Sequence, residues 1–500
     1  MGELLLGIDV GTSSSKGVLV NAAGDVLKSH VVRHAIEIPR PGWAEQDADA
    51  VWWADIVAIC KDLLDGAPYT GGDVAGVGLS ALGPCMLPLD REGRPLRKAI
   101  LYGIDTRAAA EIDWLNKRYG EEVIFEAAGM ALTSQSVAPK ILWMRRNEPD
   151  LWSRLDHVTT ASAYLTYRMT GEKVIDRRTA SYFSPMLDIR SLEWSGRLAD
   201  EIIDLDKLPR LGWSDEVAGL VHAEAAAATG LNPGTPVAVG CIDSLSEALS
   251  AGAIEPGDMA LIYGSTTVFN LVLDQPKPNR KTWLTAGAFA GQYTLIAGMG
   301  TTGAVAGWFR DELARDLTGE DAVAELFAEA ERIEPGAGGL LLLPYFSGER
   351  TPIHDPHARG VIAGLTLAHT RGHLFRAVLE GVAYGIRHNL EVIRPIAPVE
   401  RVIAVGGGTR SRAWVQIVSD VAKIAQVLPA KTVGASYGGA FLAGLASGIL
   451  TRDALASWVT YETEITPNPE HSERYEHFYR DYLKLYQQTR DIVHDLSRLS

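Results

Sequence analysis

The chain opens with two apolar runs separated by a polar turn. Residues 4–10 (LLLGIDV) and 16–20 (KGVLV) are mostly apolar, and the turn between them holds one glycine followed by four hydroxyl side chains. An apolar run of this length bounded by glycine is typical of a buried strand, although short apolar runs also occur in buried helices. The pattern therefore predicts two strands joined by a turn that is rich in hydrogen-bonding groups.

Strand-like and helix-like segments alternate along the rest of the chain, which is typical of an α/β protein with mixed sheets. Extended segments are expected at residues 26–38, 74–80, 86–90, 237–242, 259–264, 268–274, 293–298, 340–344 and 402–405. Helical spacing of apolar positions predicts helices at residues 48–64, 107–118, 139–147, 161–170, 244–251, 302–316, 371–393, 411–424 and 438–446, with a charged helical tail beyond residue 469. We divide the chain into an N-terminal domain, residues 1–243, and a C-terminal domain, residues 244–500.

Length and composition indicate a globular protein of more than one domain. The 500 residues are 47% hydrophobic and 22% charged, which is enough for sizeable cores. A net charge of −15 argues against a nucleic-acid or membrane partner, because either would need a basic patch. The three cysteines form no CxxC pair, the N-terminus shows no signal-type segment, and no run of about 20 apolar residues occurs. We therefore expect a cytoplasmic protein without a disulfide framework or a zinc site.

The polar turn has the composition of an anion site. Gly11 lets a ligand approach the backbone closely, and Thr12 to Ser15 add four hydroxyls to the backbone N–H groups, which suits a phosphate. Asp9 stands just before the turn, where a carboxylate is placed to hold Mg²⁺ through its water shell. The alternative is an ordinary polar hairpin whose aspartate caps the turn, because glycine, aspartate and serine are common turn residues.

Three further glycine-rich loops follow apolar segments in the second half of the chain. They are YGSTT at 263–267, GMGTTG at 298–303 and GGGTRSR at 406–412, and the last two open predicted helices. The start of a helix presents free N–H groups and a positive dipole end to an anion. Each loop alone is explained by the glycine that turns require, but together with the polar turn they favour a nucleotide site. The Walker P-loop pattern GxxxxGK[ST] does not occur.

The loop at 298–303 also fits GxGxxG, the fingerprint of dinucleotide-binding folds. It lies between a predicted strand and a predicted helix, and Glu320 or Asp321 stands near the offset of a ribose-binding acid. An NAD-dependent oxidoreductase is therefore an alternative function. Against it, the motif lies in the middle of the chain, and Asp9 with its polar turn would have no role.

Asp243 is the candidate catalytic base. It follows a predicted strand and begins a predicted helix, between Ile242 and Ser244. An aspartate at this place commonly caps the helix, and that alternative is compatible with catalysis. A base for phosphoryl transfer has only to accept a hydroxyl proton while the reacting groups are held in line.

Together these residues resemble the FGGY family of carbohydrate kinases, in the superfamily of actin and hexokinase. The resemblance runs nearly end to end through GIDVGTSSSKGVLV (7–20), PKILWMRRN (139–147), GCIDSLSEALSAG (240–252), SGERTPIHDPHARGVIAGL (347–365), HLFRAVLEGVAYGI (373–386) and GGGTRSRAWVQIVSD (406–420). The ERTP segment with the following HLxxAVLEG is highly specific, whereas the glycine loops alone are not. The family implies an α/β fold of two actin-like (ribonuclease H-like) domains, each a five-stranded mixed sheet flanked by helices, with a central cleft.

The resemblance also implies a reaction and a set of site residues. The family transfers the γ-phosphoryl group of ATP, with Mg²⁺, to a primary hydroxyl of a sugar or polyol. By position, Asp243 is the base that deprotonates this hydroxyl, and Asp9 faces Mg²⁺ and the phosphates. The implied nucleotide-binding residues are Gly11, Thr12, Ser13, Lys16, Ser265, Gly303, Gly307, Gly408 and Arg412. A homodimer is common in the family, and a non-catalytic ATP and sugar sensor of the same fold remains an alternative.

Within the family the closest likeness is to xylulokinases, but the sugar-contacting loop differs. Where those enzymes have QMHG, with a histidine that contacts the sugar, this chain has Leu82 to Cys85 (LGPC), and their WNDxR-like segment reads YGIDTR at 102–107. The candidate substrate residues are Gly83, Pro84, Cys85, Asp105, Gln135 and Asp243. A pocket built for a given hydroxyl discriminates strongly, so the resemblance predicts a xylulose-like ketopentose or a related polyol without identifying which.

Overall fold

The computed structural model describes residues 3–66, 68–318 and 322–499, and the chain divides into two compact units. The first unit comprises Met1–Pro256, Val272–Thr294 and Val433–Thr460, and the second comprises Gly257–Leu271, Leu295–Thr432 and Tyr461–Ser500. Each unit is therefore assembled from several segments of the chain. The continuous domains 1–243 and 244–500 stay a prediction about the sequence, and the two compact units are described separately below.

The first unit is built on a mixed sheet of seven strands, two more than the five expected. In spatial order the strands are β13 (Val217–Leu220), β14 (Pro236–Ala238), β5 (Val74–Ala81), β1 (Leu4–Val10), β2 (Ser14–Asn21) and β3 (Val26–Arg33), with β15 (Cys241–Ile242) beside β5. β1 is antiparallel to β2 and parallel to β5. The five strands were implied by the family resemblance, and the sheet exceeds that count because short strands such as β13 and β15, of 4 and 2 residues, also pair into it.

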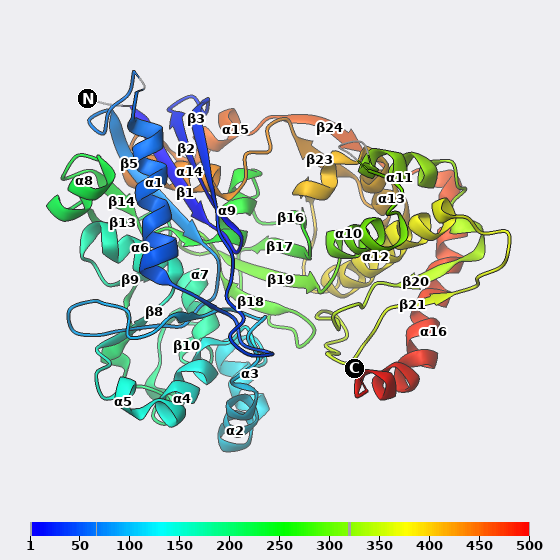
Figure 1. The fold of residues 1–500 in the computed structure, drawn as a ribbon, viewed down its shortest axis with the longest axis horizontal. Helices are drawn as coiled ribbons and strands as arrows, with labels where there is room; N and C mark the ends of the chain where they lie inside the picture. Colours follow the sequence, from blue (N-terminus) through cyan, green and yellow to red (C-terminus); the bar gives the residue numbers. More distant parts are fainter. Residues whose placement is uncertain (1–2, 67, 319–321, 500) are drawn as a thin grey trace. The chain divides into compact units, whose positions relative to one another are not determined.

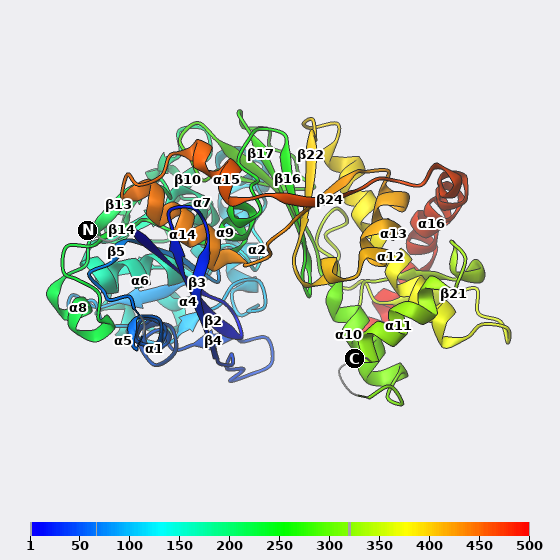
Figure 2. The same cartoon turned by 90° about the horizontal axis from the view of Figure 1, so that it is seen from above.

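Helices cover both faces of this sheet (Figures 1 and 2). Gly7 and Ile8 are neighbours in β1, so their side-chain positions point to opposite faces. α14 (Ala435–Ala446) approaches so closely at Gly7 that an added Cβ would lie 1.9 Å from one of its carbonyl oxygens. α1 (Ala54–Leu64) packs where Gly17 pairs with Ile8, and an added Cβ there would meet an α1 side chain at 2.2 Å. A helix from the C-terminal part of the chain, orange in Figure 1, thus covers a sheet begun by the first strands.

The second sheet also has seven strands. In spatial order they are β18 (Trp283–Ala286), β19 (Tyr293–Met299), β17 (Thr267–Leu273), β16 (Asp258–Tyr263), β22 (Arg401–Val405), β23 (Gln426–Pro429) and β24 (Tyr461–Ile465). β16 is antiparallel to β17 and parallel to β22, so this sheet is mixed as well. The limit between the compact units passes through β17 and β19. Two mixed α/β sheets confirm the expected fold class.

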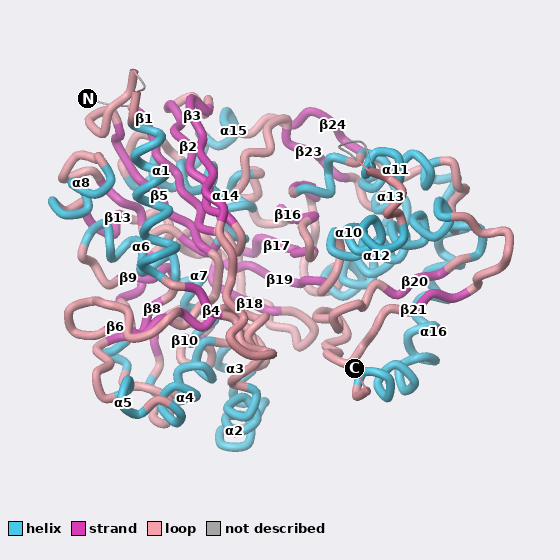
Figure 3. The backbone as a smooth tube through the Cα atoms, viewed as in Figure 1, coloured by secondary structure: helices cyan, strands magenta, loops and turns pink. Residues whose placement is uncertain are grey.

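The second unit also contains several long helices (Figure 3). They are α10 (Gly303–Leu313), α11 (Ala322–Glu331), α12 (Arg371–Ile393), α13 (Arg412–Ala422) and α16 (Ser472–Ser497). α12 begins and ends at the predicted residues, and most of its side chains are buried. α10 ends three residues before the predicted end, at Leu313.

The remaining elements are short or connect the main ones. The strands are β4 (Glu45–Gln46), β6 (Leu87–Leu89), β7 (Ala99–Ile100), β8 (His157–Thr159), β9 (Val174–Asp176), β10 (Leu187–Asp188), β11 (Glu193–Trp194), β12 (Arg210–Gly212), β20 (Leu341–Leu343) and β21 (Val361–Ala363). The helices are α2 (Ala109–Tyr119), α3 (Glu121–Ala128), α4 (Val137–Asn147), α5 (Pro149–Trp152), α6 (Ala161–Thr170), α7 (Arg177–Ala180), α8 (Ala223–Thr229), α9 (Asp243–Ser250) and α15 (Leu455–Trp458). Across the described ranges, no helix combines the length and the apolar character needed to cross a bilayer.

Candidate active site

Asp9 lies at the end of β1, between side chains of both neighbouring strands. The strand register pairs it with Lys16 on β2 and with Ser80 on β5. The Ser80 hydroxyl donates a hydrogen bond of 2.7 Å to Asp9 Oδ1. Asp9 is half-buried at this edge of the sheet.

Asp243 lies at the same edge of the sheet as Asp9. It directly follows β15, whose two residues pair with Ser80 and Ala81 at the end of β5. Asp243 is the first residue of α9, the N-cap is Ile242, and Asp243 Oδ1 accepts a hydrogen bond of 2.6 Å from the Ser244 N–H. The carboxylate is therefore aligned by the helix start rather than used as the cap itself.

Glu247, one helical turn after Asp243, is a third acidic residue of this site. Residues four positions apart lie on one face of a helix, so the i,i+4 spacing was the sequence signal for it. Lys16 donates a hydrogen bond of 2.5 Å from Nζ to the carbonyl oxygen of Val433, in the segment that leads into α14. No local pattern marks Val433, because its place at the site depends on the return of residues 433–460 to the first unit.

The acidic side chains disfavour one another's ionised forms. Burial, followed by repulsion from Asp243, raises the pKa of Asp9 to about 8. Burial also raises the pKa of Asp243 to about 7, against the opposing effect of Arg178, which is fully buried. Burial raises the pKa of Glu247 and lowers that of Lys16. A cation placed among these carboxylates would relieve their repulsion.

The donor set fits Mg²⁺ held mainly by water and phosphate oxygens. Carboxylate oxygens are the ligands that Mg²⁺ prefers, and the ion usually takes only one or two of them from a protein. Within the described ranges, no three His, Cys, Asp or Glu side chains are arranged to enclose a metal ion. Asp9 is therefore a fitting single contact for a hydrated Mg²⁺ that arrives with a nucleotide.

The backbone carbonyls of the polar turn are tied back to the protein. The Gly11 carbonyl oxygen lies 3.0 Å from His34 Nε2, and the Thr12 carbonyl accepts a hydrogen bond of 3.3 Å from Gln46 Nε2. The Ser13 carbonyl accepts the His34 backbone N–H at 3.0 Å, and the Ser14 carbonyl accepts the Gly11 N–H at 2.9 Å. Turning the carbonyl oxygens toward protein donors leaves the opposite side of the turn suited to an anion.

The four hydroxyls of the turn do not all face the anion cavity that the sequence predicts. Thr12 Oγ1 shares a hydrogen bond of 2.6 Å with the Tyr102 hydroxyl. Ser15 is buried, and its hydroxyl donates at 2.7 Å to Asp55 Oδ2. Ser15 belongs to β2, where successive side chains point to opposite faces, so it lies on the face opposite Lys16. The anion cavity therefore has at most three of the four hydroxyls expected for it.

The loop predicted to contact the sugar is largely buried. Pro84 and Cys85 are buried, and the Cys85 N–H donates to Thr160 Oγ1 at 3.1 Å. Burial raises the pKa of the Cys85 thiol to about 12, so the side chain is a protonated thiol at neutral pH. Gly83 is partly exposed, and an added Cβ would touch the Ile242 side chain at 3.4 Å, next to Asp243. Gly83 is therefore the one residue of Leu82 to Cys85 that is not buried.

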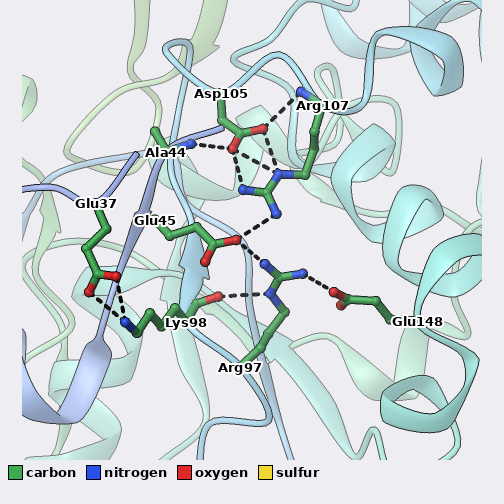
Figure 4. Close-up of polar contacts among 8 residues, drawn as sticks. All are labelled: Glu37, Ala44, Glu45, Arg97, Lys98, Asp105, Arg107 and Glu148. Carbon is green, nitrogen blue, oxygen red and sulfur yellow. Dashed lines mark hydrogen bonds and ion pairs between the residues drawn. The ribbon is translucent and has the colours of Figure 1, made fainter. Parts of the chain in front are cut away.

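Asp105 is enclosed by protein groups (Figure 4). Its side chain is fully buried. Asp105 Oδ2 accepts hydrogen bonds from the Ala44 N–H at 2.7 Å and from Arg107 Nη2 at 2.6 Å. Arg107 Nη1 also forms an ion pair with Glu45 Oε1 at 2.8 Å. The Arg107 guanidinium also lies over the Trp43 ring, with Cζ 3.9 Å from its centroid. These contacts give Asp105 the role of an anchor for the loop and offer no support for its expected contact with substrate.

Gln135 is connected to the polar turn through the YGIDTR loop. Its Oε1 accepts a hydrogen bond of 3.4 Å from the Gly103 N–H, and Ser134 Oγ donates to the Gly103 carbonyl at 2.9 Å. Tyr102, the preceding residue, is the partner of Thr12. Gln135 is partly exposed, so the structure leaves its side chain available near the turn.

The second unit contains a cavity of about 670 Å³ that collects predicted nucleotide residues. Gly303, Gly307, Gly408 and Arg412 all line it, whereas Ser265 does not. Ser265 instead supports the loop from behind, since its carbonyl accepts the N–H groups of Thr302 at 2.9 Å and Ala304 at 3.1 Å. The walls that sequence reasoning missed are aromatic and basic: Phe327, Phe375, Trp414, Arg310 and Arg410.

The glycines of this cavity serve two different purposes. An added Cβ at Gly303 would lie 2.7 Å from the Gly264 carbonyl oxygen, and one at Gly408 would lie 2.9 Å from Tyr263 Cβ. These two glycines are required by close packing of the protein itself. An added Cβ at Gly307 meets no protein atom within 4 Å, so a side chain there would enter the cavity.

The ERTP segment braces the GMGTTG loop residue by residue. Thr351 Oγ1 accepts the Gly298 N–H at 2.7 Å, Arg350 Nη2 donates to the Met299 carbonyl at 2.6 Å, and Glu349 Oε1 accepts the Gly300 N–H at 2.6 Å. Three consecutive residues therefore fix three consecutive positions of the glycine loop. The GxGxxG pattern is accounted for by this bracing, and the proposed ribose acids Glu320 and Asp321 lie outside the described residues.

Comparison with known proteins gives one consistent family. The N-terminal domain model of the FGGY family of carbohydrate kinases matches residues 4–250, and its C-terminal domain model matches residues 259–447. The chain is 32% identical over 452 residues to a xylulose kinase of Escherichia coli (strain K12), covering 89% of this chain and 90% of that protein. It is 27% identical over 488 residues to a gluconokinase of Bacillus subtilis (strain 168), covering 95% and 94%. The crystal structure of xylulose kinase from Rhodospirillum rubrum superposes with a TM-score of 0.90 at 33% identity, covering 98% of this chain and 100% of that one.

Proposed function

Because the chain belongs to the FGGY family of carbohydrate kinases, it is an ATP-dependent phosphotransferase with an alcohol acceptor, and we propose that it phosphorylates xylulose or a related ketose or polyol on a primary hydroxyl. The observation that carries the catalytic part is the position of Asp243, beside Asp9 at one edge of the first sheet, with its pKa raised to about 7 by burial. The relatives named xylulose kinase support the acceptor.

Asp243 acts as the general base in the proposed reaction. Its carboxylate takes the proton of the acceptor hydroxyl while the hydroxyl oxygen bonds to the γ-phosphorus and the bond to the β–γ bridging oxygen breaks, so that ADP leaves. A base works best when its pKa lies near the working pH. Burial brings the pKa of Asp243 into this range, and the Ser244 N–H keeps the carboxylate oriented.

Asp9 is the proposed contact for Mg²⁺. When bound, the ion supplies positive charge that neutralises the phosphate oxygens. Ser80 orients the Asp9 carboxylate, and Lys16 adds a second positive group at the same sheet edge. Gly11, Thr12 and Ser13 form the turn proposed to receive the terminal phosphate.

The cavity of the second unit is the proposed site of the nucleotide. Phe327, which is partly exposed and is backed by the buried rings of Phe375 and Trp414, suits an adenine ring, which gains from stacking and from leaving water. Arg410 and Arg412 supply charge for the polar part of the nucleotide. Gly307 leaves the room that a ligand needs against α10.

The identity of the acceptor is tested by ADP release over a panel of candidates. The panel contains xylulose, ribulose, other ketoses, erythritol, glycerol and gluconate, the last because gluconokinases are among the relatives. We expect release that depends on the acceptor and is strongest with xylulose or a related ketose. Loss of the QMHG histidine and burial of Cys85 predict a preference different from a standard xylulokinase pocket.

Two outcomes of this experiment would overturn parts of the proposal. ADP release that does not depend on any acceptor, or no release at all, would favour a non-catalytic sensor of ATP and sugar. Strong activity with gluconate or glycerol alone would support the kinase assignment and reject a ketose as the acceptor. The use of ATP supports a cytoplasmic location. We also propose a homodimer, because homodimers are common in the family, and size-exclusion chromatography with light scattering measures the oligomeric state.

A further inference from the structure

His34 lies directly behind the polar turn and touches it twice. It follows β3, and its backbone N–H donates to the Ser13 carbonyl at 3.0 Å. Its ring Nε2 lies 3.0 Å from the Gly11 carbonyl oxygen, and its ring Nδ1 lies 2.8 Å from Asp55 Oδ2 on α1. The side chain is 7% exposed, so water does not replace these partners freely.

Both ring nitrogens of His34 face groups that only accept hydrogen bonds. A neutral imidazole has one N–H and serves one of the two oxygens, whereas an imidazolium has two and serves both. The charge is balanced by Asp55, which is also held by the Ser15 hydroxyl at 2.7 Å. Burial opposes the charged ring, but hydrogen bonds to Asp55 and to the Gly11 carbonyl outweigh it and raise the pKa of His34.

We propose that protonated His34 is a positioning residue for phosphoryl transfer, which holds the Gly11 carbonyl away from the phosphate side of the turn. The proposal rests on the assignment of residues 11–13 to the terminal phosphate. A carbonyl oxygen that rotated toward the phosphate would repel it, because the oxygen carries a partial negative charge and the phosphate is an anion. His34 prevents this rotation at Gly11 and fixes Ser13 through its backbone.

The groups around the ring define what its titration changes. The Asp55 carboxylate faces it from α1, and the carbonyl oxygens of Gly11 and Thr12 face it from the turn. On β3 itself, the ionisable side chains His30 and Lys28 are directed to Asp62. When the ring loses a proton, the ion pair with Asp55 retains the Nδ1–H, and Nε2 then presents a lone pair to the Gly11 oxygen.

The proposal predicts that activity falls at high pH because His34 loses its second ring proton. As pH rises through the pKa of the ring, we expect kcat/KM for MgATP to fall by about 3–10-fold, the equivalent of one intramolecular hydrogen bond. Deprotonation of Asp243, the proposed base, acts in the opposite direction and gives the rise at low pH. Deprotonation of Asp9, whose pKa is about 8, acts in the same direction as that of Asp243. The fall that belongs to His34 is therefore identified by comparing variants.

The test compares pH profiles of three variants with the wild type. In His34→Gln the side-chain amide donates to the Gly11 oxygen at every pH, so activity is retained and the high-pH fall disappears. Asp55→Asn removes the charge that favours the imidazolium, so the fall moves to lower pH. The matched control is His30→Gln, on the same strand but paired with Asp62 at 3.1 Å, which leaves the profile unchanged.

The outcomes separate this inference from the proposed function. A wild type without acceptor-dependent ADP release rejects the kinase assignment itself. An active wild type whose high-pH fall persists unshifted in both His34→Gln and Asp55→Asn rejects the role of His34. Hydrogen exchange of residues 11–15 gives an independent reading when each rate is expressed as a protection factor, relative to the intrinsic rate at the same pH. Lower protection at pH 8.5 than at pH 6.5 in the wild type but not in His34→Gln supports the proposal, and equal protection factors at the two pH values in both proteins overturn it.

Discussion

The carboxylate of Glu349 holds the backbone N–H of Gly300 at 2.6 Å and so fixes the glycine loop that opens α10. The same oxygen accepts the Arg350 N–H at 2.8 Å. Burial raises the pKa of Glu349 to about 7, which shows that the carboxylate is kept in this place at an electrostatic cost. This most specific segment of the sequence therefore acts as a brace for the loop beside the proposed nucleotide cavity.

Glu349→Ala is expected to raise the KM for ATP by about tenfold, because a buried N–H left without an acceptor costs about 1–3 kcal/mol. Glu349→Gln keeps an oxygen in place for Gly300 and is expected to stay within about threefold of the wild type. Initial rates at varied ATP with saturating acceptor measure both. A larger loss in the glutamine variant than in the alanine variant would contradict the brace.

Asp243→Asn is expected to lower kcat by about 10²–10⁴-fold, the usual contribution of a general base. The asparagine keeps an oxygen that can accept the Ser244 N–H, so folding and ATP binding are expected to persist. Steady-state kinetics and nucleotide binding by calorimetry measure the two effects. Unchanged turnover would remove Asp243 from the base role.

Asp9→Asn is expected to increase the Mg²⁺ concentration needed for half-maximal activity by about tenfold, because a neutral amide attracts the ion and its water shell less than a carboxylate does. The Ser80 hydroxyl can still donate to the amide oxygen, which limits structural damage. A titration of Mg²⁺ at constant ATP gives the result. If the Mg²⁺ dependence is unaltered, the metal assignment of Asp9 is wrong.

Asp243→Asn is also expected to change how stability depends on pH. The pKa of Asp243 is about 7 in the folded protein, against about 3.9 in unfolded chains. Its contribution is thus fully present below the unfolded value and is lost as pH rises through about 7. The gain in melting temperature of the variant over the wild type should therefore increase by about 1–3 °C as pH rises from 5 to 8.5, without Mg²⁺ or nucleotide. A difference in melting temperature that stays constant with pH would contradict the assignment.

Gly307→Leu is expected to raise the KM for ATP by about 5–100-fold while leaving the melting temperature nearly unchanged, because filling an occupied space costs about 1–3 kcal/mol. No protein atom lies within 4 Å of an added Cβ there, so the clash falls on the ligand. Ala304→Leu adds bulk to an exposed position of α10 that does not line the cavity, and it is the matched control. Equal effects of the two substitutions would place the nucleotide elsewhere.

Local sequence patterns determined the bounds of several secondary-structure elements and the positions of the family motifs. β1 and α12 have the predicted bounds, because a continuous apolar run and a long 3.6-residue period each leave little choice of secondary structure. The family motifs also placed four of the five expected residues of the second unit along one cavity. These features depend on residues that are close together in the chain or lie inside one motif.

Only the tertiary structure decided which distant side chains share a site. The return of α14 to the first sheet brings Val433 to Lys16, and the strand register brings Ser80 to Asp9. Packing brings the Ala44 N–H to Asp105, and the end of β3 places His34 behind Gly11. Periodicity encodes which face of an element is buried, but it carries no information about which other element will cover that face. The functional assignment could therefore begin from motifs, whereas the residues that orient and tune the catalytic groups followed from the fold.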